Sequence, residues 1–431
     1  MKRKEFIQKA GLLTAGVIGV PYLLPTGRLF AGTGTRSVNH VVLCMFAGGV
    51  RNIETMQKAE GNLLRNMISG SESITADIAS LMDNLPTLTN SPLSQYGTLY
   101  KNFRYNSLLA GHFQGNTVAL TGAYVDSFVN FNDYTPKPSI FEFYHKHNSS
   151  STTAKNNWWI SNSPGENELL SQSLDANYGG KYAANFLCPN IFIPNNSYKP
   201  VDLCSTFGAP EKKSADELRT LLNNSFNKPI QVNTNFSNTP QDKEDIDAFV
   251  NTLLADANAG VYTDPWGTGV MSGDMYNIYF AERVIKQFKP ELLCVNMTDV
   301  DTCHANFSNY CVNLHRADYA VAHLWQTIQN TPGMKDDTIM IVVPEHGRDG
   351  VHNTVTDAQG RKGIDHGGDN VSKEIFCMVL GPSNVVYQNN IINGVEGESI
   401  DIVPTIASVL GFLPDIPSNY ITGKVLKSAL K

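Results

Sequence analysis

The sequence predicts an α/β fold with a doubly wound, mostly parallel sheet, helices on both faces and an irregular inserted lobe. Continuous apolar runs alternate with helical patterns, mainly in the C-terminal half, which is typical of parallel strands buried on both faces. Residues 125–240 interrupt this alternation, being rich in Asn, Ser, Tyr and Pro with weak periodicity, so we expect an ordered insertion or lid there. A chain of 431 residues is long enough for one large domain with such an insertion.

Four apolar runs are the expected strands. They lie near residues 41–46, 292–297, 338–343 and 374–380, and we expect all four to be parallel and close together. The first ends in the glycines of "FAGGV", which indicates a tight loop directly after the strand.

Helices are expected between these runs. The apolar residues of 240–260 repeat on one face, with Pro240 at the start and Gly260 at the end. Residues 272–288, 313–334 and 399–412 show the same type of pattern, each next to an expected strand. The predicted order therefore alternates helix and strand along the C-terminal half.

The composition excludes some classes of protein. A net charge of −7 argues against a general nucleic-acid-binding protein, which would show a basic face. No Cys-x-x-Cys pair occurs, so a zinc site built from thiolates is not expected. We expect no nucleic-acid partner.

The first 32 residues have the layout of an export signal. A basic start precedes an apolar stretch from Ala10 to Leu24 and small residues around Ala31. The stretch is short and contains Pro21, so we expect no retained transmembrane helix. Arg3 followed by Lys4 resembles a twin-arginine signal with Lys in place of the second Arg, and the general secretion route stays open. We expect the mature protein in the periplasm or cell envelope of a bacterium.

Acidic residues and histidines lie beside three of the expected strands. They are Asp299, Asp301 and His304 after one strand, Glu345 and His346 after the next, and Asp365 and His366 shortly before a third. Ligands bind outside the carboxyl ends of strands in an open parallel sheet, so we expect these loops to meet at one edge. Oxygen and nitrogen donors without thiolates suit Zn²⁺, with Mn²⁺ or Fe²⁺ as alternatives. The sequence therefore predicts a site for one or two divalent ions.

The motifs of residues 290–412 resemble those of the alkaline phosphatase superfamily. They are "DTCH" at 301–304, "EHG" at 345–347, "HG" at 366–367 and "DIVPTIASVLG" at 401–411. The resemblance implies a phosphatase-like or phosphodiesterase-like α/β fold with metal ligands at Asp301 (or Asp299), His304, Glu345, His346 and His366.

Two departures from the family pattern concern the chemistry. The first expected strand ends in Ala47-Gly48-Gly49, where the family has an Asp for the second metal ion. "GHFQGNTVALTGAY" resembles the family's nucleophile helix, and His112 stands at the nucleophile position. A sulfatase is excluded by the resemblance, since that chemistry needs a Cys or Ser there. We expect His112→Thr to restore activity only together with Gly48→Asp.

Two interpretations follow. In the first, the protein is an exported metal-dependent hydrolase of small anionic phosphate esters. Asp301, His304 and His366 would bind one ion and His112, Glu345 and His346 a second. Glu54 is a candidate for the missing Asp, or else a solvated loop carboxylate. In the second, the protein is catalytically inactive and is a binding or assembly component with partners in the cell envelope. Arg51 and Arg348 lie beside the expected site and are candidates for binding an anionic substrate.

Overall fold

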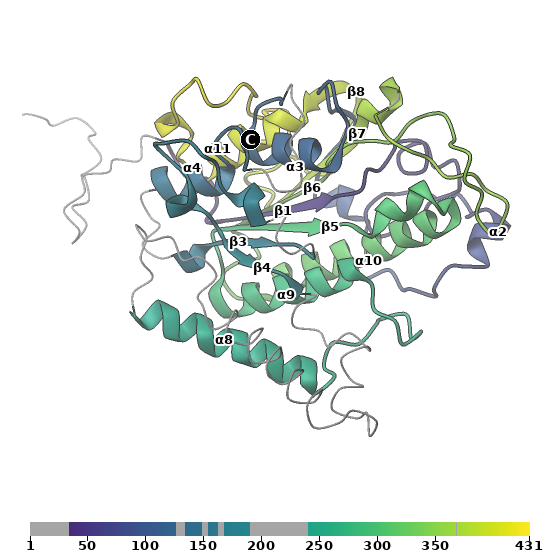
Figure 1. Cartoon of the computed structure of the whole chain (residues 1–431), viewed down its shortest axis with the longest axis horizontal. Coiled ribbons are helices and arrows are strands. Elements are labelled where there is room, and N and C mark those ends of the chain that lie inside the picture. Colours follow the sequence, from purple (N-terminus) through teal and green to yellow (C-terminus); the bar gives the residue numbers. More distant parts are fainter. Residues whose placement is uncertain (1–33, 126–133, 149–153, 163–167, 190–239, 368) are drawn as a thin grey trace, which may run out of the picture.

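A computed structural model of the chain describes residues 34–125, 134–148, 154–162, 168–189, 240–367 and 369–431 (Figure 1). The expected export signal and residues 190–239 of the expected insertion lie outside the described residues. None of the helices within the described ranges combines the length and the apolar character needed to cross a membrane.

An eight-stranded sheet with the order β4-β3-β5-β1-β6-β7-β2-β8 forms the centre of the described part of the chain. The strands are β1 (His40–Phe46), β2 (Gly97–Arg104), β3 (Asn157–Ile160), β4 (Asn185–Leu187), β5 (Leu292–Met297), β6 (Thr338–Pro344), β7 (Glu374–Leu380) and β8 (Asn390–Glu398). All four strands expected from apolar runs are present. The other four have shorter or more polar sequences, and their signal in the sequence is correspondingly weak.

One strand runs against the others. β1 is parallel to both β5 and β6, but β7 is antiparallel to β6 and to β2. The sheet is mostly parallel, as predicted, whereas the expectation that the strand near 374–380 is parallel is wrong. Because of this reversal, the loop before β7 lies at the same edge as the loops after β1, β5 and β6.

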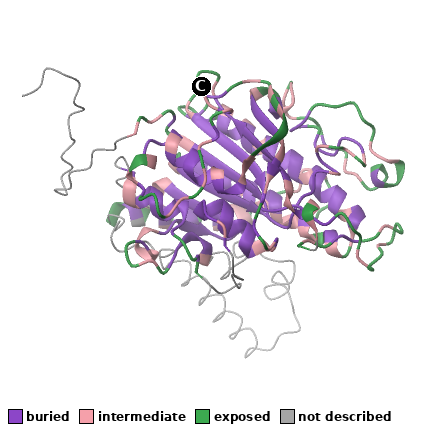
Figure 2. Ribbon diagram, turned by 90° about the horizontal axis from the view of Figure 1, so that it is seen from above, coloured by how far each residue is buried: buried purple, intermediate pink, exposed green. Residues whose placement is uncertain are grey.

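β1 occupies the centre of the sheet and has two buried faces. Val42, Cys44 and Phe46 pack into one hydrophobic cluster, and the residues between them pack into a second cluster on the other face. Figure 2 shows the strands as a buried layer beneath more exposed loops. A continuous apolar run is what burial on both faces requires, and its presence in β1 explains why this strand was recognisable.

Helices cover both faces of the sheet (Figure 1). α8 (Pro240–Asn258), α9 (Gly273–Phe288) and α10 (Phe307–Asn330) contribute apolar residues to one cluster. α3 (His112–Thr121), α4 (Ile140–His147) and α11 (Ile402–Val409) contribute to the other, and the short α2 (Ala76–Ala79) lies against α10. The doubly wound α/β architecture predicted from the sequence is confirmed.

Side-chain caps fix where two of these helices begin. Ser272 accepts a hydrogen bond from the backbone N–H of Met275 at the start of α9. This helix covers the expected range 272–288 except for its first residue, which is the cap. Asn306 caps α10 in the same way, so this helix begins at Phe307 rather than near residue 313. The expected start was late because the capping asparagine precedes a stretch with polar residues.

The described parts of residues 125–240 belong to the sheet and its covering layer. They supply α4, β3 and β4, and β3 pairs directly with β5. Trp158 and Trp159 point to opposite faces of β3 and are almost completely buried, one in each hydrophobic cluster. These described parts are therefore core elements, and the expected lid stays a prediction for the rest of the insertion.

Candidate metal centre

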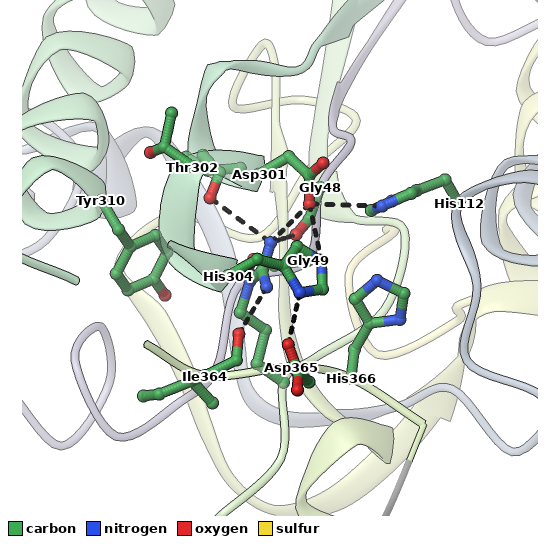
Figure 3. Close-up of polar contacts among 12 residues, drawn as sticks. Gly48, Gly49, His112, Asp301, Thr302, His304, Tyr310, Ile364, Asp365 and His366 are labelled. Atoms are coloured by element: carbon green, nitrogen blue, oxygen red, sulfur yellow. Dashed lines mark hydrogen bonds and ion pairs between the residues drawn. The ribbon is translucent and has the colours of Figure 1, made fainter. Parts of the chain in front are cut away.

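The candidate site lies at the edge of the sheet where β1, β5 and β6 end (Figure 3). The short 3₁₀ helix after β5 carries Asp301 and His304, and Glu345 and His346 follow β6. His112 is the first residue of α3, and His366 comes from the loop before β7. The loops that the sequence predicted to converge do so, and the helix expected to carry His112 brings it to the same place.

Among the residues that the structure describes, two groups of side chains have ligand atoms close enough to hold a metal ion. The first contains His112, Asp301, His304 and His366, and the second contains His112, Glu345 and His346. Within each group all ligand atoms lie within 4.8 Å of one another. The groups match the two ligand sets expected from the sequence, except that His112 belongs to both.

Three of the four imidazole rings are oriented by a partner outside the group. Nδ1 of His304 contacts Oδ1 of Asp365 at 2.6 Å, and Nδ1 of His366 contacts the carbonyl of Ala110 at 2.5 Å. Nδ1 of His346 contacts the carbonyl of Gly347 at 2.6 Å. Carbonyl and carboxylate oxygens only accept, so each Nδ1 donates its proton to a partner outside the group and each Nε2 is directed into the site. Metal-binding histidines are commonly oriented in this way.

Two of these Nε2 atoms face carboxylate oxygens of the site. Nε2 of His346 lies 3.2 Å from Oε1 of Glu345, both side chains are fully buried, and this nitrogen has no hydrogen-bond partner. Nε2 of His304 lies 3.1 Å from Oδ1 of Asp301. Each of these pairs is joined either by a proton on Nε2, as in the hydrogen bond from His304 to Asp301, or by a cation in the place of that proton. The residues present therefore fit divalent ions.

His112 is the exception among the rings. Its Nδ1 lies 2.7 Å from Oε1 of Glu345, and its Nε2 lies 3.2 Å from Oδ1 of Asp301. Burial by itself would lower the pKa of His112, but the charges and hydrogen bonds of Glu345 and Asp301 outweigh it and raise the pKa to about 10. Without a metal ion, His112 is an imidazolium between two carboxylates.

The pKa values of the two carboxyl groups, Glu345 and Asp301, are lowered instead of raised. Burial would raise the pKa of Glu345, but the charges of His112 and His346 lower it to about 2. Burial would also raise the pKa of Asp301, and hydrogen bonds from His112 and His304 hold it well below its usual range. Both groups are therefore ionised at neutral pH, which is the state that binds metal.

Arg348 holds the loops of the site together instead of facing a substrate. Its side chain is fully buried, and its guanidinium donates to Oδ1 of Asp301 at 2.8 Å. It also donates to the carbonyls of Gly48, Gly49 and Ile364, which belong to the loops after β1 and before β7. These contacts occupy the donors that the sequence interpretation assigned to an anionic substrate.

Arg51 is likewise engaged within the protein. Its guanidinium makes a bidentate pair with Glu54 and donates to the carbonyl of Asp349 at 3.0 Å. Arg51 is only 5% exposed and Glu54 only 1% exposed. Glu54 belongs to neither metal group, so it does not replace the missing Asp, and it is not a solvated loop carboxylate either.

Asp299 also lies outside both groups. Its Oδ2 accepts a hydrogen bond from the backbone N–H of Asp274, and Oδ1 of Asp274 accepts from the N–H groups of Thr298 and Asp299. This reciprocal pair joins the start of α9 to the end of β5. The alternative that Asp299 is the ligand after β5 finds no support in this geometry, which places Asp301 in the first group instead.

Two further polar residues belong to the site: Asp365, which the sequence placed at this edge without a role, and Asn116, which the sequence interpretation missed. Asp365 orients His304 and also accepts from Nδ2 of Asn353 at 3.0 Å. Asn116 donates to Oε2 of Glu345. Asn116 is four residues after His112, so helical spacing alone puts both side chains on one face of α3. That spacing was a usable signal once the helix was expected.

Glycines let the elements of the site approach closely. A Cβ on Gly115 of α3 would lie 2.9 Å from Cβ of Glu345, so the helix packs directly on the loop after β6. Gly48 has φ +119° and its N–H donates to Oε1 of Glu345 at 2.5 Å. A Cβ there would lie 2.7 Å from the backbone nitrogen of Asp301. Aspartate therefore does not fit at position 48 without a shift of the backbone, which argues against the expected gain from Gly48→Asp with His112→Thr.

No family model matches the chain, and no curated protein matches it in sequence. Solved structures do match. One is a protein in the alkaline phosphatase superfamily from Vibrio parahaemolyticus, at 11% identity and TM-score 0.45, covering 95% of this chain and 76% of that one. A mutant of the alkaline phosphatase PafA matches at 11% identity and TM-score 0.49, covering 92% of this chain and 100% of that one.

A phosphonate monoester hydrolase from Silicibacter pomeroyi matches at 12% identity and TM-score 0.42, covering 91% of this chain and 76% of that one. At these identities and TM-scores the matches give no argument about the activity of this chain. The proteins to which this chain is similar nevertheless include members of the alkaline phosphatase superfamily, the family that the motifs of residues 290–412 resemble.

Proposed function

We propose that the protein is an exported, metal-dependent hydrolase of phosphate esters. The observation that carries the proposal is the orientation of His304, His346 and His366, whose Nδ1 atoms are tied to protein acceptors and whose Nε2 atoms remain for the site. Zn²⁺ is the expected ion because imidazole nitrogens and carboxylate oxygens form the donor set, and Mn²⁺ and Fe²⁺ are alternatives.

A substrate would approach the site on the side of Asp301, His304 and His366. The side chains of Asp301 and His304 are 42% and 36% exposed, whereas those of Glu345 and His346 are fully buried. A divalent ion held there would supply Lewis acidity toward a phosphoryl oxygen and a bound water of lowered pKa. Asp365 keeps His304 in its tautomer, and Arg348 keeps Asp301 in place.

His112, the first residue of α3, determines which mechanism of hydrolysis we propose. His112 has no hydroxyl, and both of its nitrogens contact carboxylates of the site. We therefore propose direct attack of water on phosphorus, with the alcohol as leaving group and no covalent intermediate on the protein. The choice of phosphate esters rests on the resemblance of the motifs of residues 290–412.

The second candidate function is a catalytically inactive component of the cell envelope. It is favoured by the two arginines, which are 5% and 0% exposed and so do not face an anionic ester. In that case the ions would stabilise the fold, and the partners would be envelope proteins.

Metal analysis with an ester screen distinguishes the two. The purified mature protein should contain one or two Zn²⁺ per chain by mass spectrometry and should hydrolyse p-nitrophenyl phosphate or bis-p-nitrophenyl phosphate. His366→Ala removes one imidazole ligand of the first group, so we expect the affinity for that ion and the activity to fall by about 100-fold. His352→Ala is the matched control, because this exposed histidine lies in the loop before His366 but outside both groups. Metal without hydrolysis of either ester would favour the inactive component, and a protein without metal would contradict the proposal.

Export is a separate part of the proposal. Residues 1–32 carry the pattern of a signal, and we propose that they are removed. Intact-mass analysis of the protein from its native host should show an N-terminus near Gly32. Retention of Met1 in a cytoplasmic pool would contradict it.

A further inference from the structure

His112 is shared by the two candidate metal groups through different atoms. Nε2 faces Asp301 in the first group at 3.2 Å, and Nδ1 faces Glu345 in the second group at 2.7 Å. Figure 3 shows His112 and His304 both directed at Asp301. One ring thus lies between the two sets of ligands, with one nitrogen directed to each.

The outer partners of the four rings set His112 apart. Each of the other three rings has its Nδ1 tied to a carbonyl or to Asp365, so it can offer only one nitrogen to an ion. The Nδ1 of His112 instead faces Glu345, which is itself a member of a metal group. Both nitrogens of His112 are therefore directed at ligand sets, and neither is used for orientation alone.

The spacing of the donor atoms is that of ligands around one ion. Two ligand atoms about 2.1 Å from a tetrahedral Zn²⁺ are about 3.3 Å apart. The Nε2–Oδ1 distances from His112 and His304 to Asp301 are 3.2 and 3.1 Å. The Nε2–Oε1 distance from His346 to Glu345 is 3.2 Å. These three pairs already have about the required separation, whereas Nδ1 of His112 lies 2.7 Å from Oε1 of Glu345 and this pair would have to open when an ion binds.

The surroundings of His112 keep the ring in this position. Asn116, one turn later on α3, donates to the backbone carbonyl of His112 at 2.8 Å and to Oε2 of Glu345. The N–H of Gly48 donates to Oε1 of the same glutamate at 2.5 Å. The glutamate and the ring are thus held by elements that the rest of the fold fixes.

We propose that His112 is a bridging ligand, with Nε2 bound to an outer ion that Asp301, His304 and His366 complete, and Nδ1 bound to an inner ion that Glu345 and His346 complete. The inference rests on the proposed metal-dependent function. The ring takes the place of a nucleophile and joins the two ions, and both of its ring protons leave to solvent when the ions bind. The outer ion has partly exposed ligands and faces the substrate, whereas the buried inner ion has no direct access to it.

Copper is a suitable probe because exchange through a bridging imidazole couples two Cu²⁺ spins, which lowers the electron paramagnetic resonance signal below that of two isolated ions. We would strip the full chain with a chelator, load it with Cu²⁺ or Zn²⁺, and measure ions per chain by mass spectrometry together with the copper spectrum. The wild type should bind two ions per chain and show the weakened signal of a coupled pair.

His112→Gln is the decisive variant. The outer ion keeps Asp301, His304 and His366, whereas the inner ion is left with Glu345 and His346 alone. We expect one ion per chain and the full signal of one uncoupled Cu²⁺. His323→Gln is the matched control, because His323 lies on α10 and pairs with Glu282 outside both groups, and it should retain two coupled ions.

The outcomes separate this inference from the proposed function. Two uncoupled ions in the wild type, a single ion in the wild type, or two ions retained in His112→Gln would overturn the bridge while leaving a metal-dependent hydrolase intact. A wild type that binds no ion would overturn both. If His112→Gln does not fold, the spectrum of the wild type decides alone.

Discussion

Gly48 shows how a single residue limits what the site can become. Its φ is +119°, and a Cβ at this position would lie only 2.7 Å from the backbone nitrogen of Asp301, so there is no room for a side chain. We expect Gly48→Ala to lower the free energy of unfolding by about 3 kcal/mol or more, from backbone strain and a clash with backbone. Gly333→Ala is the control, since Gly333 has φ +87° and nothing within 4 Å, and should cost about 1 kcal/mol. Equal losses in urea unfolding would show that the clash is absent.

The charge of His112 makes the stability of the metal-free protein depend on pH. Its pKa is raised from 6.5 to about 10, so the stability that it contributes is fully present below pH 6.5 and is lost as the pH rises through 10. In the presence of a chelator, the wild type should exceed His112→Gln in unfolding free energy most near pH 6, and the difference should shrink toward pH 10. A difference that grows with pH would contradict this assignment.

The contribution of His366 to the stability of the metal-free protein depends on pH in the opposite direction to that of His112. Burial first, and then the charges of His346 and His112, lower its pKa from 6.5 to about 3. The unfolded chain therefore binds a proton at His366 below pH 6.5 that the folded protein does not, and the wild type loses stability as the pH falls toward 3. His366→Gln should reduce this loss in the same chelator-treated unfolding series, and the part that remains comes from carboxylates of lowered pKa such as Glu345.

Arg348 connects elements that are far apart in the chain. Its guanidinium joins the loop after β1, the 3₁₀ helix after β5 and the loop before β7. Lysine offers one point charge in place of this planar set of donors and would leave buried carbonyls unpaired. We expect Arg348→Lys to cost about 3–5 kcal/mol of unfolding free energy and to weaken Zn²⁺ binding.

Arg361→Lys is the matched control for that change. Arg361 lies in the same loop region but pairs with Glu60 and Asp77 where its side chain is 24% exposed. We expect a cost within about 1 kcal/mol for such pairs. Similar losses for the two variants in chemical unfolding would argue against the connecting role of Arg348.

Metal binding should stabilise the whole molecule because the ligands come from loops along one sheet. β1 lies between β5 and β6, and β7 pairs with β6, so the ions join the ends of neighbouring central strands. At about 100 times the dissociation constant, a ligand adds about 2.7 kcal/mol. We expect chelation to lower the Tm in calorimetry by about 3 °C as one shifted transition. His366→Ala should show a much smaller response, and an unchanged wild-type Tm would contradict a metal site in the fold.

The sequence alone was sufficient for the strands β1, β5, β6 and β7, for the helices next to them, and for the identity of the six side chains that meet. These features depend on local pattern: burial on two faces demands a continuous apolar run, and a helix repeats its apolar residues every three or four positions. The weak signals of β3, β4 and β8 come from short or edge strands, and that of β2 comes from polar residues within an interior strand.

Only the tertiary structure decided the direction of β7. This direction brings the loop before β7, with His366, to the site. A parallel β7 would have placed the preceding loop at the opposite edge of the sheet. It also decided that Arg51 and Arg348 bind protein groups, that Glu54 and Asp299 lie outside the ligand sets, and that His112 contacts both. Each of these depends on which distant loops share a buried space, and a residue's type and its neighbours in sequence do not contain that information.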